Sequence, residues 1–106
     1  MSDQTRRYLV VFQPWFDEQA ELEMPARGYL QDVDVRFDDG ATYRLYFMDP
    51  VRLQQDAAGE FETGRTVFAE PGLVVVPEVT RGNILAAVEQ LFADNFFEHL
   101  RPVPEE

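Results

Sequence analysis

Carboxylates are the reactive side chains that this sequence offers in number, with 20 acidic residues among 106. Paired carboxylates can serve as general acid and base, and carboxylate oxygens can bind hard cations. Two stretches are dense enough to do either. The first stretch contains two aromatic residues followed by acids, namely Trp15, Phe16, Asp17, Glu18, Glu21 and Glu23. The second contains four aspartates, Asp32, Asp34, Asp38 and Asp39.

The second stretch does not have the spacing of a metal loop. Asp32 and Asp34 alternate onto one face of an expected strand, and Asp38 and Asp39 occupy the turn that follows it. The calcium-binding pattern of oxygen ligands at fixed intervals is absent from the sequence. Aspartate is common in turns and on solvated strand faces, and we interpret these residues in that way. No metal site is predicted.

The first stretch has the densest local negative charge, because no basic residue occurs between Arg7 and Arg27. Aromatic residues beside uncompensated acids are typical of a contact surface for a basic partner. The alternatives are a solvated acidic surface and a Trp15 that closes the core. We predict a partner-binding surface formed by Trp15, Asp17, Glu18, Glu21 and Glu23.

Other catalytic chemistry finds little support in the sequence. His99 is the only histidine and lies beside Glu98 near an expected helix end, where capping or surface packing explains it. The chain has no cysteine, which excludes thiol nucleophiles, disulfides and cysteine-ligated metals. Its six glycines are isolated and form no phosphate-binding loop. We therefore expect no catalytic residue, no cofactor and no enzyme activity.

The net charge of -11 bears on partners and location. Binding of nucleic acid or of an anionic membrane needs an excess of basic residues, so a basic protein is the more compatible partner. The nine basic residues are all arginines, which a GC-rich genome explains as well as interface use does. No apolar run approaches the roughly 20 residues of a bilayer span, and the five apolar residues before Gln13 are too few for a signal peptide. We expect a cytoplasmic protein.

A β-hairpin is the element that the sequence predicts best. Two alternating apolar and polar runs meet at Asp38-Asp39-Gly40, and a three-residue loop with a left-handed Gly40 gives both strands one apolar face. This register pairs Val35 with Tyr43 and Val33 with Leu45. On the other face it pairs Arg36 with Thr42, Asp34 with Arg44 and Asp32 with Tyr46. We predict that Asp32, Asp34, Arg44 and Tyr46 form a secondary contact surface.

Further strands and helices follow from apolar spacing and from helix-capping residues. Besides hairpin strands at 29–37 and 41–48, strands are expected at 8–12, buried on both faces, at 66–69, and at 73–76, which is apolar enough to be central. Helices are expected at 50–58, between an Asp49 cap and Gly59, and at 80–94 after a Thr80 cap. Residues 14–24 form either a helical turn or an ordered loop. The last helix ends at Asn95, which we favour, or continues to Leu100.

Together these elements predict one α+β domain spanning 1–106, with frayed ends at 1–6 and 102–106. A mainly antiparallel sheet of four or five strands carries a long C-terminal helix on one face and a short helix near 50–58. The leading functional hypothesis is a non-enzymatic acidic module that binds a basic protein, such as an inhibitor, an immunity-type protein, a small chaperone or an assembly subunit. The alternatives are a small-ligand or carboxylate-based enzyme domain, and self-association through a sheet edge or the face of Tyr46 and Met48.

Overall fold

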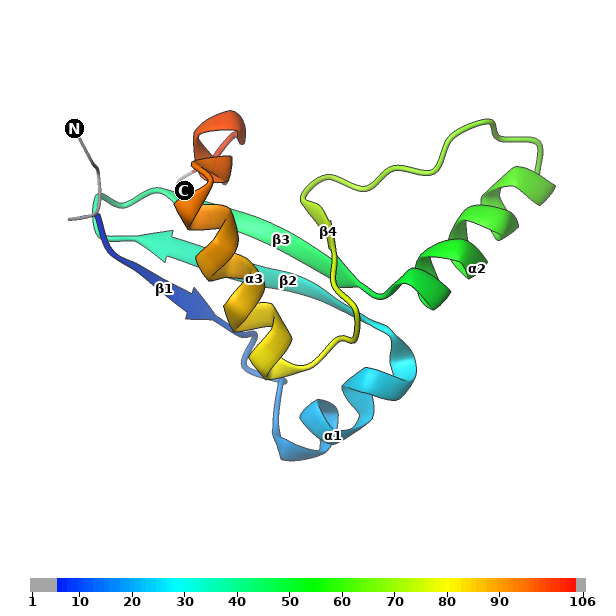
Figure 1. Ribbon diagram of the computed structural model, residues 1–106, viewed down its shortest axis with the longest axis horizontal. Helices are drawn as coiled ribbons and strands as arrows, with labels where there is room; N and C mark the ends of the chain where they lie inside the picture. The colour runs from blue at the N-terminus through cyan, green and yellow to red at the C-terminus, as the bar shows by residue number, and fades with distance from the viewer. Residues whose placement is uncertain (1–5, 105–106) are drawn as a thin grey trace.

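The computed structural model describes residues 6–104, and within them the fold is α+β, as predicted from the sequence. This part of the chain forms a four-stranded sheet and three α-helices (Figure 1). In order, the elements are β1 (Tyr8–Val11), α1 (Glu18–Arg27), β2 (Tyr29–Phe37), β3 (Thr42–Met48), α2 (Pro50–Glu62), β4 (Leu73–Val75), α3 (Arg81–Ala93) and the 3-10 turn η1 (Phe96–His99).

The sheet is mixed, which corrects the prediction of a mainly antiparallel sheet of up to five strands. Its order is β1-β2-β3-β4, with antiparallel pairing of the first three strands and parallel pairing of β3 with β4. A parallel neighbour requires a long crossover, and α2 with residues 63–72 provides it. The apolar strand at 73–76, expected at the centre, is therefore the edge strand β4. Residues 66–69, expected as a strand, lie in the crossover without a partner strand.

The predicted hairpin register is confirmed from Arg36 to Val33. Val35 lies opposite Tyr43, Val33 opposite Leu45 and Asp34 opposite Arg44. The Phe37 amide donates to the Ala41 carbonyl at 2.8 Å, and Gly40 has a φ of 96°, as the three-residue loop requires.

A β-bulge interrupts this register where the prediction paired Asp32 with Tyr46. Leu30 lies opposite Phe47 and Val33 opposite Leu45, so two residues of β2 face the single residue Tyr46 of β3. The bulge lets Leu30 and Val33, three residues apart, both enter the core. Gln31 and Asp32 are consequently both exposed and lie across from Tyr46, and the simple Asp32–Tyr46 pair is wrong.

Helix α3 packs across one face of the sheet and completes the core. Its buried side chains Ile84 and Val88 join those of the hairpin, and the Thr80 hydroxyl caps it by accepting from the Asn83 amide at 3.1 Å. The helix ends before Asn95, which has a φ of 59°, and Phe97 returns to the core. The predicted break at Asn95 is confirmed. With 13 residues, α3 is no longer than α2, so the expected long C-terminal helix is shorter than predicted.

The two other helices differ from their predictions. In 14–24, where a turn or loop was expected, α1 begins after Asp17, whose carboxylate accepts from the Ala20 amide at 2.9 Å, and it continues through Pro25 to a left-handed Gly28. Helix α2 begins at Pro50 after the predicted Asp49 cap but passes through Gly59 to Glu62. No helix in residues 6–104 has the length and apolar content of a membrane span.

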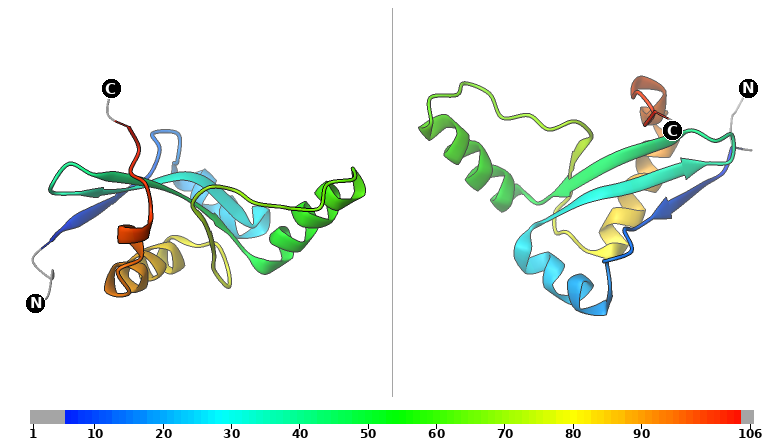
Figure 2. Two further views of the ribbon diagram at one scale, coloured as in Figure 1. Left: turned by 90° about the horizontal axis from the view of Figure 1, so that it is seen from above. Right: turned by 180° about the vertical axis from the view of Figure 1, so that it is seen from behind.

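The face of the sheet opposite α3 is free of helices in the described part of the chain, and we call it the open face (Figure 2). Leu9 of β1 lies on it and is 68% exposed, so the prediction that β1 is buried on both faces is wrong.

Frayed ends were also expected. Residues 1–5 and 105–106 lie outside the described residues. Arg6 lies over the Phe37 ring at 3.9 Å, and the Val103 amide donates to the Thr42 carbonyl at 2.7 Å.

Candidate functional site

The acidic stretch predicted as the main partner surface is partly neutralised in the fold. Glu21 receives two hydrogen bonds from Arg81, at 3.0 and 3.1 Å, and Glu23 pairs with Arg27 at 3.0 Å. The Asp17 side chain caps α1. The hydrogen bond from Arg81 lowers the pKa of Glu21, and the positive charge of that guanidinium adds to the effect. Of the four acids, Glu18 alone has neither a cap role nor a salt bridge within residues 6–104.

Trp15 is 55% exposed, so it does not close the core. Its ring meets Phe16 edge-on, with centroids 6.2 Å apart. It borders a hollow of about 160 Å³ between α1 and the start of β2, which is lined also by Ala20, Met24, Arg27, Tyr29, Leu30 and Gln31. This hollow contains one charged side chain, Arg27, which is already paired with Glu23. The structure therefore places Trp15 beside a cavity without free carboxylates.

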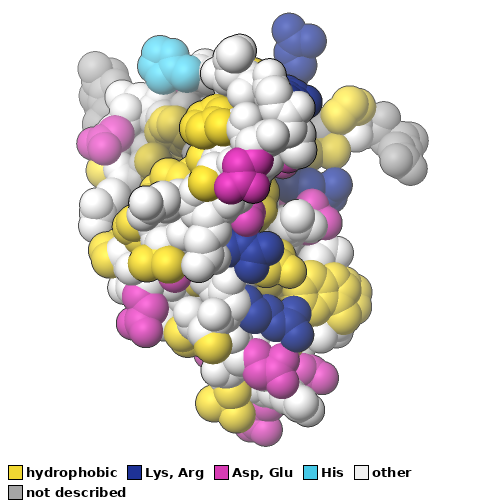
Figure 3. All heavy atoms as spheres, turned by 90° about the vertical axis from the view of Figure 1, so that its right-hand side faces the viewer, with side chains coloured by type: hydrophobic (Ala, Val, Ile, Leu, Met, Phe, Trp, Pro, Cys, Tyr) yellow, Lys and Arg dark blue, Asp and Glu magenta, His cyan; other side chains and the backbone are white. Residues whose placement is uncertain are grey.

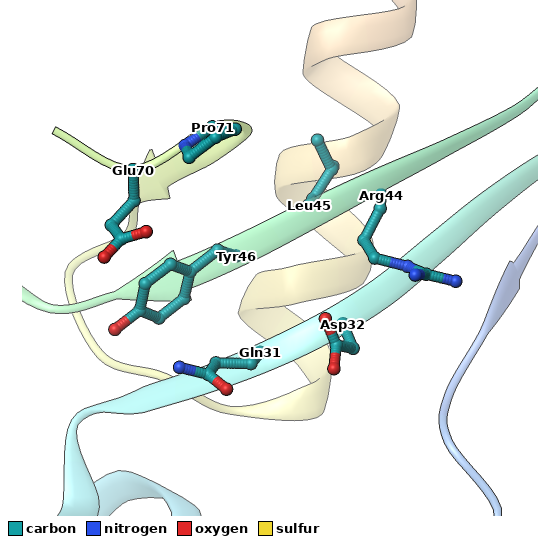
Figure 4. Close-up of a pocket in the computed structure, with 7 residues that line it drawn as sticks. All are labelled: Gln31, Asp32, Arg44, Leu45, Tyr46, Glu70 and Pro71. Carbon is teal, nitrogen blue, oxygen red and sulfur yellow. The ribbon is translucent and has the colours of Figure 1, made fainter. Parts of the chain in front are cut away.

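The predicted secondary surface gathers at a larger pocket on the open face, which we call the Tyr46 pocket (Figure 4). It has a volume of about 350 Å³. Its side chains come from the β2 bulge, from β3 and from the turn before β4, and it is lined by Gln31, Asp32, Arg44, Leu45, Tyr46, Glu70 and Pro71. Glu70 and Gln31 approach the ring of Tyr46 from opposite sides.

The bulge in β2 directs Asp32 into this pocket. Asp32 has a φ of 60°, a left-handed conformation that aspartate adopts more readily than most residues. The Gln13 side-chain amide donates to the Asp32 carbonyl at 2.9 Å and holds the bulged backbone from the end of β1. Bulges commonly redirect side chains in this way, here so that two consecutive residues, Gln31 and Asp32, face the same side.

The turn at residues 70–73 brings Glu70 to the opposite wall of the pocket. The Leu73 amide donates to the Glu70 carbonyl at 3.2 Å, and Gly72 has a φ of 75°, as in a type II turn with Pro71 before the glycine. A Cβ at Gly72 would lie 2.5 Å from the Arg44 carbonyl oxygen. Only glycine lets this turn approach β3 so closely, and the Tyr46 amide then donates to the Gly72 carbonyl at 3.0 Å.

Arg44 is held in place by a carboxylate beneath it. Its Nε and Nη2 donate to the two oxygens of Asp34 at 2.8 and 3.2 Å, and Asp34 is 7% exposed. Hydrogen bonding and charge attraction from Asp34, with a smaller contribution from Asp32, raise the pKa of Arg44. Because Asp34 already balances Arg44, the pocket keeps the charges of Asp32 and Glu70, and no salt bridge to either occurs within residues 6–104.

Tyr46 supplies an aromatic wall beside Glu70 in the same pocket. Burial raises the pKa of its hydroxyl, the charges of Asp56 and Glu70 add to the rise, and a hydrogen bond with Gln31 opposes it. Two carboxylates and an aromatic ring in one pocket attract a cation electrostatically and through the π face of the ring. No group of three potential metal ligands occurs in the part of the chain that the structure describes. Carboxylates next to an aromatic face are features that can bind an organic cation such as a guanidinium or an ammonium.

Sequence reasoning identified three pocket residues, Asp32, Arg44 and Tyr46, and the supporting Asp34. It missed Gln31 and Glu70. The three-residue spacing of Leu30 and Val33 breaks the strand alternation and was a signal for Gln31, whereas nothing local to Glu70 indicates that it faces Tyr46. Comparisons of the chain with protein-family models, with curated proteins and with solved structures gave no match.

Proposed function

We propose that this protein is a non-enzymatic interaction module that binds a basic protein in the cytoplasm, and that the Tyr46 pocket receives an arginine or lysine side chain of that partner. The observation that carries the proposal is that Asp32 and Glu70, both exposed and without a salt bridge in the described chain, line the same pocket as the ring of Tyr46. An inhibitor, an immunity-type protein, a small chaperone or an assembly subunit would use such a site to engage a basic surface.

The open face around the pocket supports docking of a protein. No described helix covers it, and Leu9 and Val75 expose apolar surface on it, at 68% and 46%. Interfaces combine apolar contact of this kind with a few oriented charges. The net charge of -11 attracts a basic partner over a longer range and disfavours nucleic acid and anionic membranes. The acidic stretch at 17–23 ranks second as a docking site, because Glu21 and Glu23 already have arginine partners.

A small cationic ligand is the second candidate, because the pocket volume of about 350 Å³ lies within the range of small-molecule sites. Binding is favoured over catalysis at this site. Enzymes that use carboxyl groups as general acids usually bury one of them, whereas Asp32 and Glu70 are both exposed.

A titration with nona-arginine, followed by fluorescence anisotropy, tests the proposal. The variant D32N/E70Q removes both pocket charges, and we expect its dissociation constant to rise about tenfold or more over wild type, as loss of two charge-assisted contacts implies. The matched control E89Q/E98Q removes two exposed carboxylates outside both candidate surfaces and the same net charge. It should lose only the small long-range contribution, because exposed charges beyond about 10 Å are screened at moderate salt.

Two further comparisons sharpen the result. Tyr46→Phe keeps the ring and should bind nearly as well as wild type, whereas Tyr46→Leu should bind clearly more weakly. Binding of N-acetyl-arginine amide as tightly as nona-arginine would favour the small-ligand candidate over the protein partner. Equal weakening by the pocket variant and its control would show that net charge alone attracts the peptide, and the proposed site would then be rejected.

A further inference from the structure

Helix α2 is an arm that projects from the body of the protein, and residues 63–72 return from its tip to β4 (Figure 1). None of its 13 residues is buried. Arg52 holds its base, with its guanidinium 4.4 Å from the centroid of the Tyr29 ring and its Nη1 donating to the Arg27 carbonyl at 3.3 Å. Isolated helices of this length are marginal in water, and the exposed interior Gly59 lowers the helix propensity further. The arm therefore lacks the tertiary packing that usually stabilises a helix.

One side of the arm carries a stripe that we call the α2 seam, formed by Val51, Gln54, Ala58 and Phe61. These four residues are spaced three, four and three apart, which is the spacing at which helices pair. All four are exposed, Val51 at 64% and Phe61 at 51%. Seen from the arm side, the molecule shows hydrophobic side chains set among the acidic ones (Figure 3). The seam is a helix-pairing face without a partner in the described chain.

Three of the four charged residues of α2 point away from the seam. At about 100° per residue, Arg52, Asp56 and Glu60 lie about 140° or more from its centre. Arg52 pairs with Asp56 at 3.0 Å, and Glu60 lies 3.7 Å from Arg65. The residues that flank the seam are Pro50, Gln55, Ala57 and Glu62, of which one is charged. A chain with a net charge of -11 thus presents a nearly neutral strip here.

Because the seam is nearly neutral, a second copy of this chain suits it better than a basic partner does. A basic partner would find a single carboxylate, Glu62, at the edge of the seam, whereas a second copy of the seam matches it in polarity. We propose that α2 pairs with α2 of a second copy of this chain to form a symmetric, antiparallel helix dimer. In this arrangement Val51 of one copy packs on Phe61 of the other, and Gln54 packs on Ala58. These are reciprocal contacts, as a two-fold interface requires.

The antiparallel direction follows from the charge of the two bodies. Helix α2 is attached to its body at Pro50, so a parallel pair would bring both acidic bodies to the same end. An antiparallel pair places them at opposite ends of helices about 20 Å long, which reduces their repulsion and also aligns the helix dipoles favourably. A pair of this length is short for a permanent dimer, and we expect dissociation in the micromolar range.

Sedimentation velocity across about 1 to 500 µM protein tests the proposal at concentrations suited to a weak dimer. Wild type should shift from monomer to dimer with concentration. Ala58→Glu places a charge within the seam and should raise the dimer dissociation constant about tenfold or more, because it buries an unpaired carboxylate. Gly59→Glu is the matched control: it adds the same charge one residue later, about 120° from the seam centre, where a Cβ meets nothing within 4 Å. It should dimerise like wild type.

Three outcomes would overturn the proposal: a monomer at all concentrations, a dimer that Ala58→Glu leaves intact, or equal weakening by the two variants. Circular dichroism checks that Ala58→Glu is folded, and Phe61→Ala, which adds no charge, must also weaken the dimer. Because the chain is cysteine-free, a mixture of Gln54→Cys and Ala58→Cys proteins reports direction. A disulfide between the two different variants supports the antiparallel pair. Disulfides within each variant alone would contradict it.

The dimer and the proposed partner site use different surfaces and respond differently to salt. Salt should weaken nona-arginine binding at the Tyr46 pocket. It should leave the dimer unchanged or strengthen it, because the seam is nearly neutral and the acidic bodies repel each other. Failure of one proposal therefore leaves the other standing.

Discussion

Replacing Gly72 by alanine should destabilise the fold both through its backbone conformation and through its contact with β3. The φ of 75° costs an L-residue about 1–2 kcal/mol. The added Cβ would also lie 2.5 Å from the Arg44 carbonyl oxygen, so the turn must withdraw from β3. Withdrawal breaks the hydrogen bond from the Tyr46 amide to the Gly72 carbonyl, worth about 1 kcal/mol. We therefore expect a loss of about 2–3 kcal/mol in the free energy of unfolding.

Gly64→Ala separates the two causes. Gly64 has a φ of 96°, but a Cβ there would meet nothing within 4 Å, so this variant bears the conformational cost alone. Urea unfolding followed by circular dichroism measures both variants. A Gly72→Ala variant within about 0.5 kcal/mol of Gly64→Ala would refute the close approach of the turn to β3. The same turn positions Glu70, so Gly72→Ala should also weaken nona-arginine binding, while Gly64→Ala should not.

Three further changes test the contacts that organise the fold. Asp34→Asn removes the charge beneath Arg44 and should cost about 1–3 kcal/mol in urea unfolding, since Asp34 is 7% exposed; no change would mean that the pair contributes nothing. Arg81 lowers the pKa of Glu21 below its ordinary 4.5, so the stability from this pair is present above that pH and is lost as the pH falls through the depressed pKa. Wild type and Glu21→Gln should accordingly differ near neutral pH and converge in strong acid, and a difference that persists in acid would contradict the pairing. Asn95 has a left-handed φ of 59°, so Asn95→Ala should lower the free energy of unfolding by about 1 kcal/mol, whereas Asn95→Gly should not. Equal effects of the two changes in thermal unfolding would argue against that conformation.

The hairpin could be predicted from the sequence because its determinants are local. The turn residues and the alternation on both sides lie within a short segment, and only one register gives both strands an apolar face. The break at Asn95 is local in the same sense, since an asparagine in the middle of an apolar arc is better placed as a left-handed cap.

Helix α1 was missed because its stability does not come from an apolar stripe. Met24 is its one buried residue, so the helical period of apolar residues is weak. The helix depends instead on the Asp17 cap, the left-handed Gly28 and the pairing of Glu21 with Arg81, which is 60 residues away. The caps could have been found in the sequence, but the distant arginine could not.

The arrangement of the sheet depended on contacts between distant segments. Residues 66–69 and 73–76 have similar β propensity, but only 73–75 find a strand to pair with, and that pairing is parallel. Propensity states that a segment suits a strand and leaves its neighbour and direction open. The crossover through α2 fixes both the neighbour and the direction of β4. The projection of α2 from the body could not be predicted from the local sequence pattern.

The same distinction explains why the sequence ranked the acidic stretch at 17–23 ahead of the surface that contains the Tyr46 pocket. Residues 17–23 are the most acidic stretch when charge is counted along the sequence. A partner, however, meets the charge of the folded surface. In the fold, Arg81 and Arg27 neutralise two of the four acids in this stretch. Asp32 and Glu70 are 38 positions apart in the sequence, so a charge count along the chain does not group them. Both residues line the Tyr46 pocket because the β2 bulge redirects Asp32 and the turn at Gly72 positions Glu70. The pocket therefore depends on two special backbone conformations.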